Sequence, residues 1–506
     1  MQRRTFLGGA SLAAAAPASG HIALEPKPLF DISPYLYMQF MEPLGVTDAS
    51  VDGAWDWDAD DWRKDFVEVV RDLAPDVIRW GGIYAQYYKW REGIGPASAR
   101  PPVRNHTWGG RESNRVGTHE FIDLCRRTGA EPLWCVNFLS DGRKRYWNTP
   151  GGLNRSGDAR EAAGWVSYCN DPSHAERRRN GAAEPFRVKL WQIGNETSYG
   201  GTGFTLEEAA HHTVEFARAM KQRDPSISLI GWGDRCGREG GRLWAGEMLQ
   251  RAGEHLDYVA VHTMAQQSPK DSNAAIGSLA YQAQPEKAWE ELRRMSGQLE
   301  AFLEEVEAEV RAASRRAKIA VTEGHPSLLH NLSPLLMEWL SGAYCGRVMN
   351  IYQRHGDMVK ICTGADFAGN RWTVNAVMFS AWSSWLLPAG SVMRLFKRVN
   401  GKQAVRVAAA PAGLDIAASR TGSRFYLHVA NMDYRDAVEA TFAVDGMAVV
   451  GGKVHEIAPG NPREAVDMDR PKVFAPKERV LPQGAAVTCR FPARSVSAVE
   501  LETRPA

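Results

Sequence analysis

The chain has 506 residues, more than one compact domain usually holds, so a large domain with a smaller companion is the expected arrangement. Its formal net charge of +2 is too small to indicate a nucleic-acid partner, and no basic stripe or recognition motif is present. The seven cysteines are scattered without close pairs, which excludes a zinc ribbon and defines no disulfide framework. The sequence is still compatible with one disulfide but does not place it.

The first 20 residues have the features of an export signal. The twin arginines in Gln2–Leu7 precede a short Gly/Ala/Leu stretch and the small-residue site Ala16–Ala18, as in twin-arginine signals. The apolar stretch is too short for a permanent membrane anchor. We therefore expect a bacterial protein that is exported to the periplasm or secreted, without a membrane span.

Between residues 21 and 400, short apolar runs alternate with longer stretches that have apolar residues at helical spacing. The expected strands are Tyr35–Phe40, Val77–Trp80, Glu131–Asn137, Val188–Gly194, Ser228–Trp232, Tyr258–His262, Ile319–Thr322 and Met358–Cys362. The expected helices include Trp62–Leu73, Thr118–Thr128, Leu206–Gln222, Trp289–Ala313 and Leu335–His355. Eight strands that alternate with helices predict an α/β fold, namely a (β/α)8 barrel.

After Asn400 the helical spacing ends and short alternating runs take over, separated by Gly, Pro, Asn and Asp. The expected strands are Ala404–Ala408, Phe425–Ala430, Val438–Val444, Lys453–Ile457, Ala486–Phe491 and Ser497–Leu501. This pattern predicts a C-terminal antiparallel β-sandwich over residues 401–506. The segment Ile22–Ile32, before the first barrel strand, is a candidate for one more strand of that sandwich.

Two glutamates follow apolar runs directly. Glu196 comes after the fourth expected barrel strand and Glu323 after the seventh. A carboxylate in such a place is often only a neighbour of a helix cap or a solvated loop residue. At the C-terminal mouth of a barrel, however, it faces the site that barrel enzymes build there. Most glycosidases cleave the glycosidic bond with two carboxyl groups that face one cavity.

Several colinear motifs make the chain similar to a known family. They are Ile32–Tyr37 with Phe40 and Glu42, Ile78–Gly82, Lys89–Pro96, Gly117–Phe121, Gly129–Pro132, Trp165–Asn170, Trp191–Glu196 and Val454–Ile457. In these residues the chain resembles glycoside hydrolase family 51, the α-L-arabinofuranosidases of the retaining clan whose two catalytic glutamates end strands four and seven. The resemblance implies a glycosidase that acts on a furanoside in an extracellular polysaccharide or oligosaccharide, with a carbohydrate as its partner.

The resemblance also implies a retaining double displacement with two catalytic residues. Glu323 would be the nucleophile, and Glu196 would be the acid and then the base. Asn195 would donate to the sugar 2-hydroxyl, and Glu42 would bind ring hydroxyls. No cofactor or metal is required. His211 and His212 are adjacent in a helix and are expected to point to different faces, so they are not an obvious pair of metal ligands.

Three further residues have roles that the sequence leaves open. Arg79, at the end of the second strand, could orient Glu323 or form a structural ion pair. His262 could line the pocket, although a histidine at the end of a buried strand is often only a core residue with satisfied hydrogen bonds. His325 stands near the nucleophile, where it could replace an aromatic residue of the family.

Departures from the family pattern cluster around the expected sugar pocket. Ile83, Met264 and Asp366 stand where the family has Asn or Cys, Tyr, and Gln, and Gly324-His325 replaces Trp-Asn after the nucleophile. The sequence therefore does not decide which sugar is cleaved. A galactofuranosidase, a D-arabinofuranosidase or a pyranosidase of the same clan is one alternative, and a non-catalytic carbohydrate-binding protein is another. The oligomeric state is open too, a homo-oligomer included.

Overall fold

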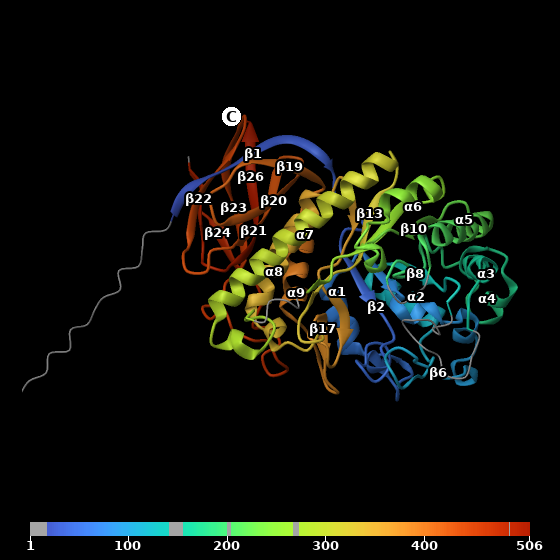
Figure 1. Ribbon diagram of the computed structural model, residues 1–506. Helices are drawn as coiled ribbons and strands as arrows, with labels where there is room; N and C mark the ends of the chain where they lie inside the picture. Colours follow the sequence, from blue (N-terminus) through green and yellow to red (C-terminus); the bar gives the residue numbers. More distant parts are fainter. Residues whose placement is uncertain (1–17, 141–154, 200–203, 267–272, 485, 506) are drawn as a thin grey trace, which may run out of the picture.

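The computed structural model describes residues 18–140, 155–199, 204–266, 273–484 and 486–505. It confirms the predicted architecture of a (β/α)8 barrel with a C-terminal antiparallel sandwich (Figure 1). The barrel strands are β2 (Met38–Met41), β5 (Val77–Trp80), β8 (Glu131–Val136), β9 (Leu190–Ile193), β10 (Ser228–Trp232), β11 (Tyr258–His262), β13 (Lys318–Glu323) and β15 (Val359–Ile361).

These strands pair in parallel in chain order, and the last strand returns to the first. A parallel bridge joins Tyr37 to Cys362, and the amide of Met38 donates to the carbonyl of Cys362 at 2.8 Å. Most strand residues are buried, as expected for strands that are covered by helices on one face and fill a barrel on the other. All eight C-terminal strand ends therefore meet at one mouth.

The helices follow amphipathic stretches and end at recognisable caps. They are α1 (Lys64–Leu73), α2 (Thr118–Thr128), α3 (Ala159–Asn170), α4 (Ala175–Arg179), α5 (Leu206–Arg223), α6 (Ala245–Ala252), α7 (Pro285–Ala313), α8 (Trp339–Arg354) and α9 (Pro388–Arg398). In α5, Thr205 and Glu208 form a capping box that satisfies two amides at the helix start. Gly129, at φ +77°, ends α2 in the left-handed conformation that glycine adopts without strain.

Further short strands lie in the loops that connect the barrel strands and helices. They are β3 (Trp55–Asp56), β4 (Asp61–Trp62), β6 (Val103–Arg104), β7 (Arg111–Glu112), β12 (Ala265–Gln266), β14 (Pro326–Ser327), β16 (Asp366–Gly369), β17 (Asn375–Phe379) and β18 (Ser384–Leu386). Loops of this kind carry the functional side chains in barrel proteins.

The sandwich strands form one mostly antiparallel sheet that folds back on itself, since β22 pairs with β23 as well as with β1. The strands are β1 (Ala18–Asp31), β19 (Gln403–Ala409), β20 (Leu414–Thr421), β21 (Arg424–Asn431), β22 (Val438–Val444), β23 (Met447–Ile457), β24 (Lys477–Leu481), β25 (Thr488–Phe491) and β26 (Val496–Pro505). β1 pairs with β19 and β22, so this sheet takes strands from both ends of the chain (Figure 1). Its apolar residues form a core cluster separate from that of the barrel.

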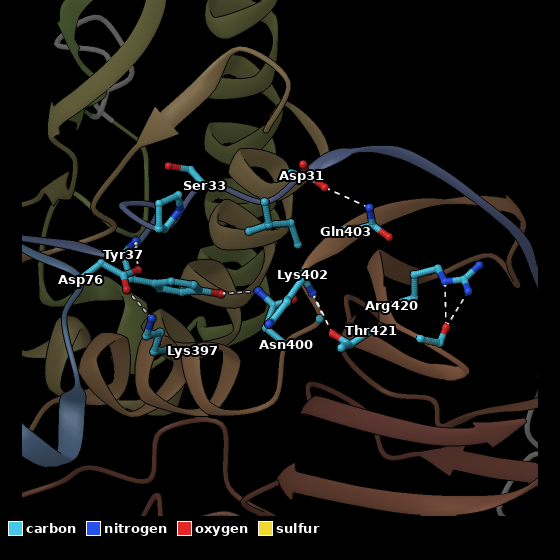
Figure 2. Close-up of a pocket in the computed structure, with 14 residues that line it drawn as sticks. Asp31, Ser33, Tyr37, Asp76, Lys397, Asn400, Lys402, Gln403, Arg420 and Thr421 are labelled. Atoms are coloured by element: carbon cyan, nitrogen blue, oxygen red, sulfur yellow. Dashed lines mark hydrogen bonds and ion pairs between the residues drawn. The ribbon is translucent and has the colours of Figure 1, made fainter. Parts of the chain in front are cut away.

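The sandwich packs against the side of the barrel along helix α8. Helix α8 packs on β20 and β21, and a cavity of about 660 Å³ lies at the junction. Figure 2 shows Tyr37 and Asp76, which precede β2 and β5, beside Lys397, and Arg420 on the sandwich side. This cavity is on the face opposite to the mouth that holds Glu196 and Glu323.

The predicted export signal lies almost entirely outside the described residues, which begin at residue 18. Within the described part of the chain, no helix is long and apolar enough to cross a membrane.

Candidate functional site

Glu196 is held just beyond the end of β9 by an unusual turn of the backbone. Both Gly194 (φ +73°) and Glu196 (φ +53°) are left-handed, and a Cβ on Gly194 would meet Phe138 at 3.0 Å. A non-glycine residue with positive φ is costly and is found mostly where the surrounding structure fixes it for a purpose. The turn places the Glu196 carboxylate inside the mouth, where the residue is only 3% exposed.

Glu323 is the last residue of β13, and it is buried beside Arg79. Nη1 of Arg79 lies 3.0 Å from Oε1 of Glu323. The backbone amide of Thr263 donates to the Glu323 carbonyl at 2.9 Å, which ties the ends of β11 and β13 together. The carboxylate therefore has a fixed direction.

Arg79 connects three strand ends through one guanidinium group. Besides its bond to Glu323, its Nε donates to Gln192 at 2.8 Å and its Nη2 donates to Oδ1 of Asn195 at 2.6 Å. The group also lies over the ring of Phe40, 4.8 Å from its centroid. A planar fork with several donors suits this arrangement better than a lysine ammonium would.

His262 stands between the two glutamates. Its Nδ1 lies 3.2 Å from Oε1 of Glu196 and 3.6 Å from Oε2 of Glu323. Its Nε2 is 3.1 Å from the hydroxyl of Thr322, and its backbone amide donates to Asp234. Burial, with the positive charge of Arg79, lowers the pKa of His262 well below its ordinary value, so the ring is neutral.

The two carboxyl groups have raised pKa values. Burial, then the negative charges of Glu323 and Glu42, raise the pKa of Glu196 well above its ordinary value. Burial also raises the pKa of Glu323, to about 7, while Arg79 opposes the shift. Two neighbouring carboxyls in an apolar site cannot both ionise readily, so protons leave the pair in two separated steps.

Glu42 accepts two hydrogen bonds at the same mouth. Its Oε1 accepts from the amide of Tyr84 at 2.7 Å and from Nε1 of Trp108 at 3.1 Å. Gly82 is required beside it, because a Cβ there would come within 2.3 Å of the carboxylate. Burial, followed by the charge of Glu323, raises the pKa of Glu42 well above its ordinary value.

His325 and Asp366 form a buried pair next to Glu323. Nδ1 of His325 lies 2.8 Å from Oδ1 of Asp366, and its Nε2 is 3.0 Å from the hydroxyl of Ser327. Burial alone would lower the pKa of His325, but Asp366 and then Glu323 outweigh it and raise that pKa. The pair therefore forms part of the wall of the site beside Glu323.

The seven residues singled out from the sequence thus lie at one mouth, Glu42, Arg79, Asn195, Glu196, His262, Glu323 and His325. Sequence reasoning missed the residues that support them. Gln192 and Thr322 are polar residues inside buried strands, and Asp234 lies two residues beyond the end of β10. A polar residue within an apolar run is the signal that could have found them.

Two groups of side chains could hold a metal ion among the described residues. Glu196, His262 and Glu323 each offer a ligand atom, and these atoms all lie within 4.8 Å of one another. The other group is at the surface of α5. His211 and His212, expected to point to different faces, both reach Glu215, at 3.4 and 2.8 Å. The expectation was wrong because positions three and four residues apart on a helix are neighbours.

Comparison with known proteins adds an independent line of evidence. Residues 69–301 match the family model of the alpha-L-arabinofuranosidase 1 domain. Alpha-L-arabinofuranosidase C of Emericella nidulans is 36% identical over 225 residues, which are 42% of this chain and 40% of that protein. An intracellular exo-alpha-(1->5)-L-arabinofuranosidase of Acetivibrio thermocellus is 30% identical over 249 residues, 46% of this chain and 45% of that protein. The matched part thus spans less than half of these relatives.

Solved structures resemble the chain over nearly its whole length. An alpha-L-arabinofuranosidase from Thermotoga maritima, solved with arabinose, has 25% identity and a TM-score of 0.74, covering 95% of this chain and 99% of that one. The GH51 arabinofuranosidase of Xanthomonas axonopodis pv. citri has a TM-score of 0.79 at 20% identity, covering 96% and 99%, and shows likeness of fold.

Proposed function

We propose that this chain, an α-L-arabinofuranosidase-like protein of the glycoside hydrolase family 51 type, is a retaining glycoside hydrolase that cleaves a furanoside linkage. The proposal rests on the buried pair of Glu196 and Glu323. One carboxylate oxygen of each lies within 4.8 Å of the other, and His262 stands between them. Retaining glycosidases hold their carboxyl groups about 5–5.5 Å apart, whereas inverting ones leave about 6.5–9.5 Å for a water molecule.

Glu323 acts as the nucleophile in the first step. Its oxygen attacks the anomeric carbon, the bond from that carbon to the leaving oxygen breaks, and Glu196 gives its proton to the leaving oxygen. The product is a glycosyl ester on Glu323 and a free alcohol. Oε2 of Glu196 accepts no hydrogen bond from the described residues, so this oxygen is available to carry the proton toward the substrate.

In the second step Glu196 acts as the base. It takes a proton from a water molecule, the water oxygen attacks the anomeric carbon, and Glu323 leaves as a carboxylate. The charge of Glu323 is one of the causes that raise the pKa of Glu196, and formation of the ester removes this charge. The pKa of Glu196 therefore falls, so Glu196 can be ionised and accept the proton of the water.

Three neighbours position these groups and the sugar. Arg79 directs Glu323 and Asn195 at once. Nδ2 of Asn195 is buried without a partner among the described residues, and it donates to the sugar 2-hydroxyl in our proposal. Glu42 binds a ring hydroxyl through the oxygen that Tyr84 and Trp108 do not occupy.

The identity of the sugar is a separate proposal. Ile83, Met264 and Asp366 replace hydroxyl partners by apolar surface and a carboxylate, so we propose a specificity that differs from plain α-L-arabinofuranosides. A galactofuranoside, a D-arabinofuranoside or a pyranoside is the alternative substrate.

A panel of substrates tests both proposals. Nitrophenyl α-L-arabino-, β-D-galacto- and α-D-arabinofuranosides, with pyranoside counterparts, are compared at equal concentration. Fast hydrolysis of a furanoside other than the α-L-arabinoside supports both. A clear preference for α-L-arabinofuranoside overturns the changed specificity. No hydrolysis with retained sugar binding favours the non-catalytic carbohydrate-binding protein.

We also propose export by the twin-arginine route, to the periplasm or beyond. The support is the order of Arg3-Arg4, an apolar stretch and a small-residue site in residues 1–20. Cell fractionation of the full chain and of an Arg3→Lys/Arg4→Lys variant tests it. Equal amounts of both outside the cytoplasm would overturn the proposal.

A further inference from the structure

A second cavity shares His262 with the pair of glutamates. It has a volume of about 280 Å³ and lies between the ends of β10 and β11 and the middle of α7. We call it the Met264 cavity after a lining residue that lies two positions beyond the end of β11. No role in the mechanism above uses this space.

The Met264 cavity adjoins the Glu196 side of the site. Tyr199, which lines it, follows Glu196 by three residues, and its amide donates to the Glu196 carbonyl at 3.0 Å. One carboxylate oxygen of Asp234 accepts both the Tyr199 hydroxyl, at 2.9 Å, and the amide of His262. Tyr199 and His262 are therefore fixed together at the point where the cavity adjoins the acid/base.

The opposite wall comes from α7 and is mostly apolar, with Gln298 as its polar residue. Met295, Leu299 and Phe302 are spaced i, i+4 and i+7 along α7, which puts them on one face of the helix toward the cavity. Arg235 lies over the Phe302 ring, 5.1 Å from its centroid. An aromatic ring placed against these three side chains would bury apolar surface and gain contacts with the methionine sulfur.

We propose that the Met264 cavity binds an apolar, aromatic aglycone of the glycoside that the two glutamates cleave. The leaving group must lie beside the residue that protonates its oxygen, and this cavity is the apolar space next to Glu196. The inference rests on the proposed function. It narrows the substrate class to aryl glycosides and to sugars that are linked to a phenolic group.

Paired substrates and a matched variant test the proposal. Met295→Gln keeps the length of a side chain on the α7 wall but adds an amide to the cavity, and Met468→Gln, at a 44% exposed position in the sandwich, is the control. We expect Met295→Gln to raise KM for an aryl furanoside about tenfold, as for loss of an apolar contact. KM for the methyl furanoside should stay within twofold for both variants.

A binding measurement that needs no catalysis separates the two proposals. Benzyl alcohol is titrated into the wild type and both variants, with saturation-transfer NMR as the readout. Binding that Met295→Gln weakens and Met468→Gln does not supports the cavity assignment. Equal binding by all three, or an equal rise in KM for aryl and methyl substrates, overturns it whatever the activity. Absence of hydrolysis of every glycoside instead overturns the proposed function, and the aglycone assignment with it.

Discussion

Nη1 of Arg79 lies 3.0 Å from Oε1 of Glu323, and the Arg79 side chain has no exposed surface. The same guanidinium holds Asn195, the residue before Glu196, so one side chain fixes the direction of one proposed catalytic group and the approach to the other. The positive charge also keeps Glu323 more acidic than burial alone would.

Replacing Arg79 by lysine should lower kcat far more than it changes KM for an activated substrate. A lysine keeps the charge but can no longer bond Gln192, Asn195 and Glu323 together, so we expect a loss of about 100-fold in kcat/KM. Arg63→Lys is the matched control, because Arg63 pairs with Asp65 at the barrel rim. Steady-state kinetics of both variants measure the effect, and similar small losses would remove Arg79 from the positioning role.

Glu196→Ala should separate substrates by their leaving groups. A nitrophenyl glycoside needs little protonation, so its first step should change less than about tenfold, whereas an alkyl or sugar leaving group should react about 10²–10⁴ times more slowly. Rates for a series of leaving groups give the comparison. A uniform loss across the series would contradict the acid role of Glu196.

The pH dependence of kcat/KM should be bell-shaped and centred above the range that is usual for exposed glutamates. Glu323 must be ionised, and its pKa is raised to about 7, so activity should fall as the pH drops through that region. Glu196 must be protonated, and its pKa is raised well above its ordinary value by burial and by the charge of Glu323, so activity should fall again at alkaline pH. In Glu196→Ala, with an activated substrate, the alkaline limb should vanish while the acidic limb stays.

A metal chelator should leave the activity unchanged, and added Zn²⁺ should inhibit. The mechanism uses no metal, but Glu196, His262 and Glu323 are close enough to bind one, which would block both carboxyl groups. His212→Gln, which breaks the surface group on α5, should keep the inhibition. Activity that chelation abolishes and a metal restores would contradict a metal-free reaction.

Much of the barrel could be predicted because its strands are buried on both faces. Tyr258–His262 and Val77–Trp80 were predicted with their observed bounds, since continuous apolar runs between helical stretches have few other structures. β20 and β24 were missed in the sandwich. β20 is rich in small residues, and β24, at the edge of the sheet, carries charged residues, so neither shows clear alternation.

The site was harder to predict than the fold. Glu196 and Glu323 can be found in the sequence because each follows a predicted strand. The pairing of His325 with Asp366 depends instead on how the segments after two strands fold back over the mouth. The contacts of Tyr199 and His262 with Asp234 likewise join three segments that are far apart in the sequence. Such contacts leave no local pattern in the sequence.

Covalent trapping tests the central claim, that Glu323 and Glu196 perform a double displacement, most directly. The protein is treated with an activated 2-deoxy-2-fluoro derivative of its best furanoside. The fluorine slows both the formation and the hydrolysis of the glycosyl ester, whereas the good leaving group speeds only its formation. The ester therefore accumulates. Peptide mass spectrometry then locates the adduct. We predict one sugar on Glu323. An adduct on Glu196, or turnover with inverted configuration and no adduct, would contradict the account.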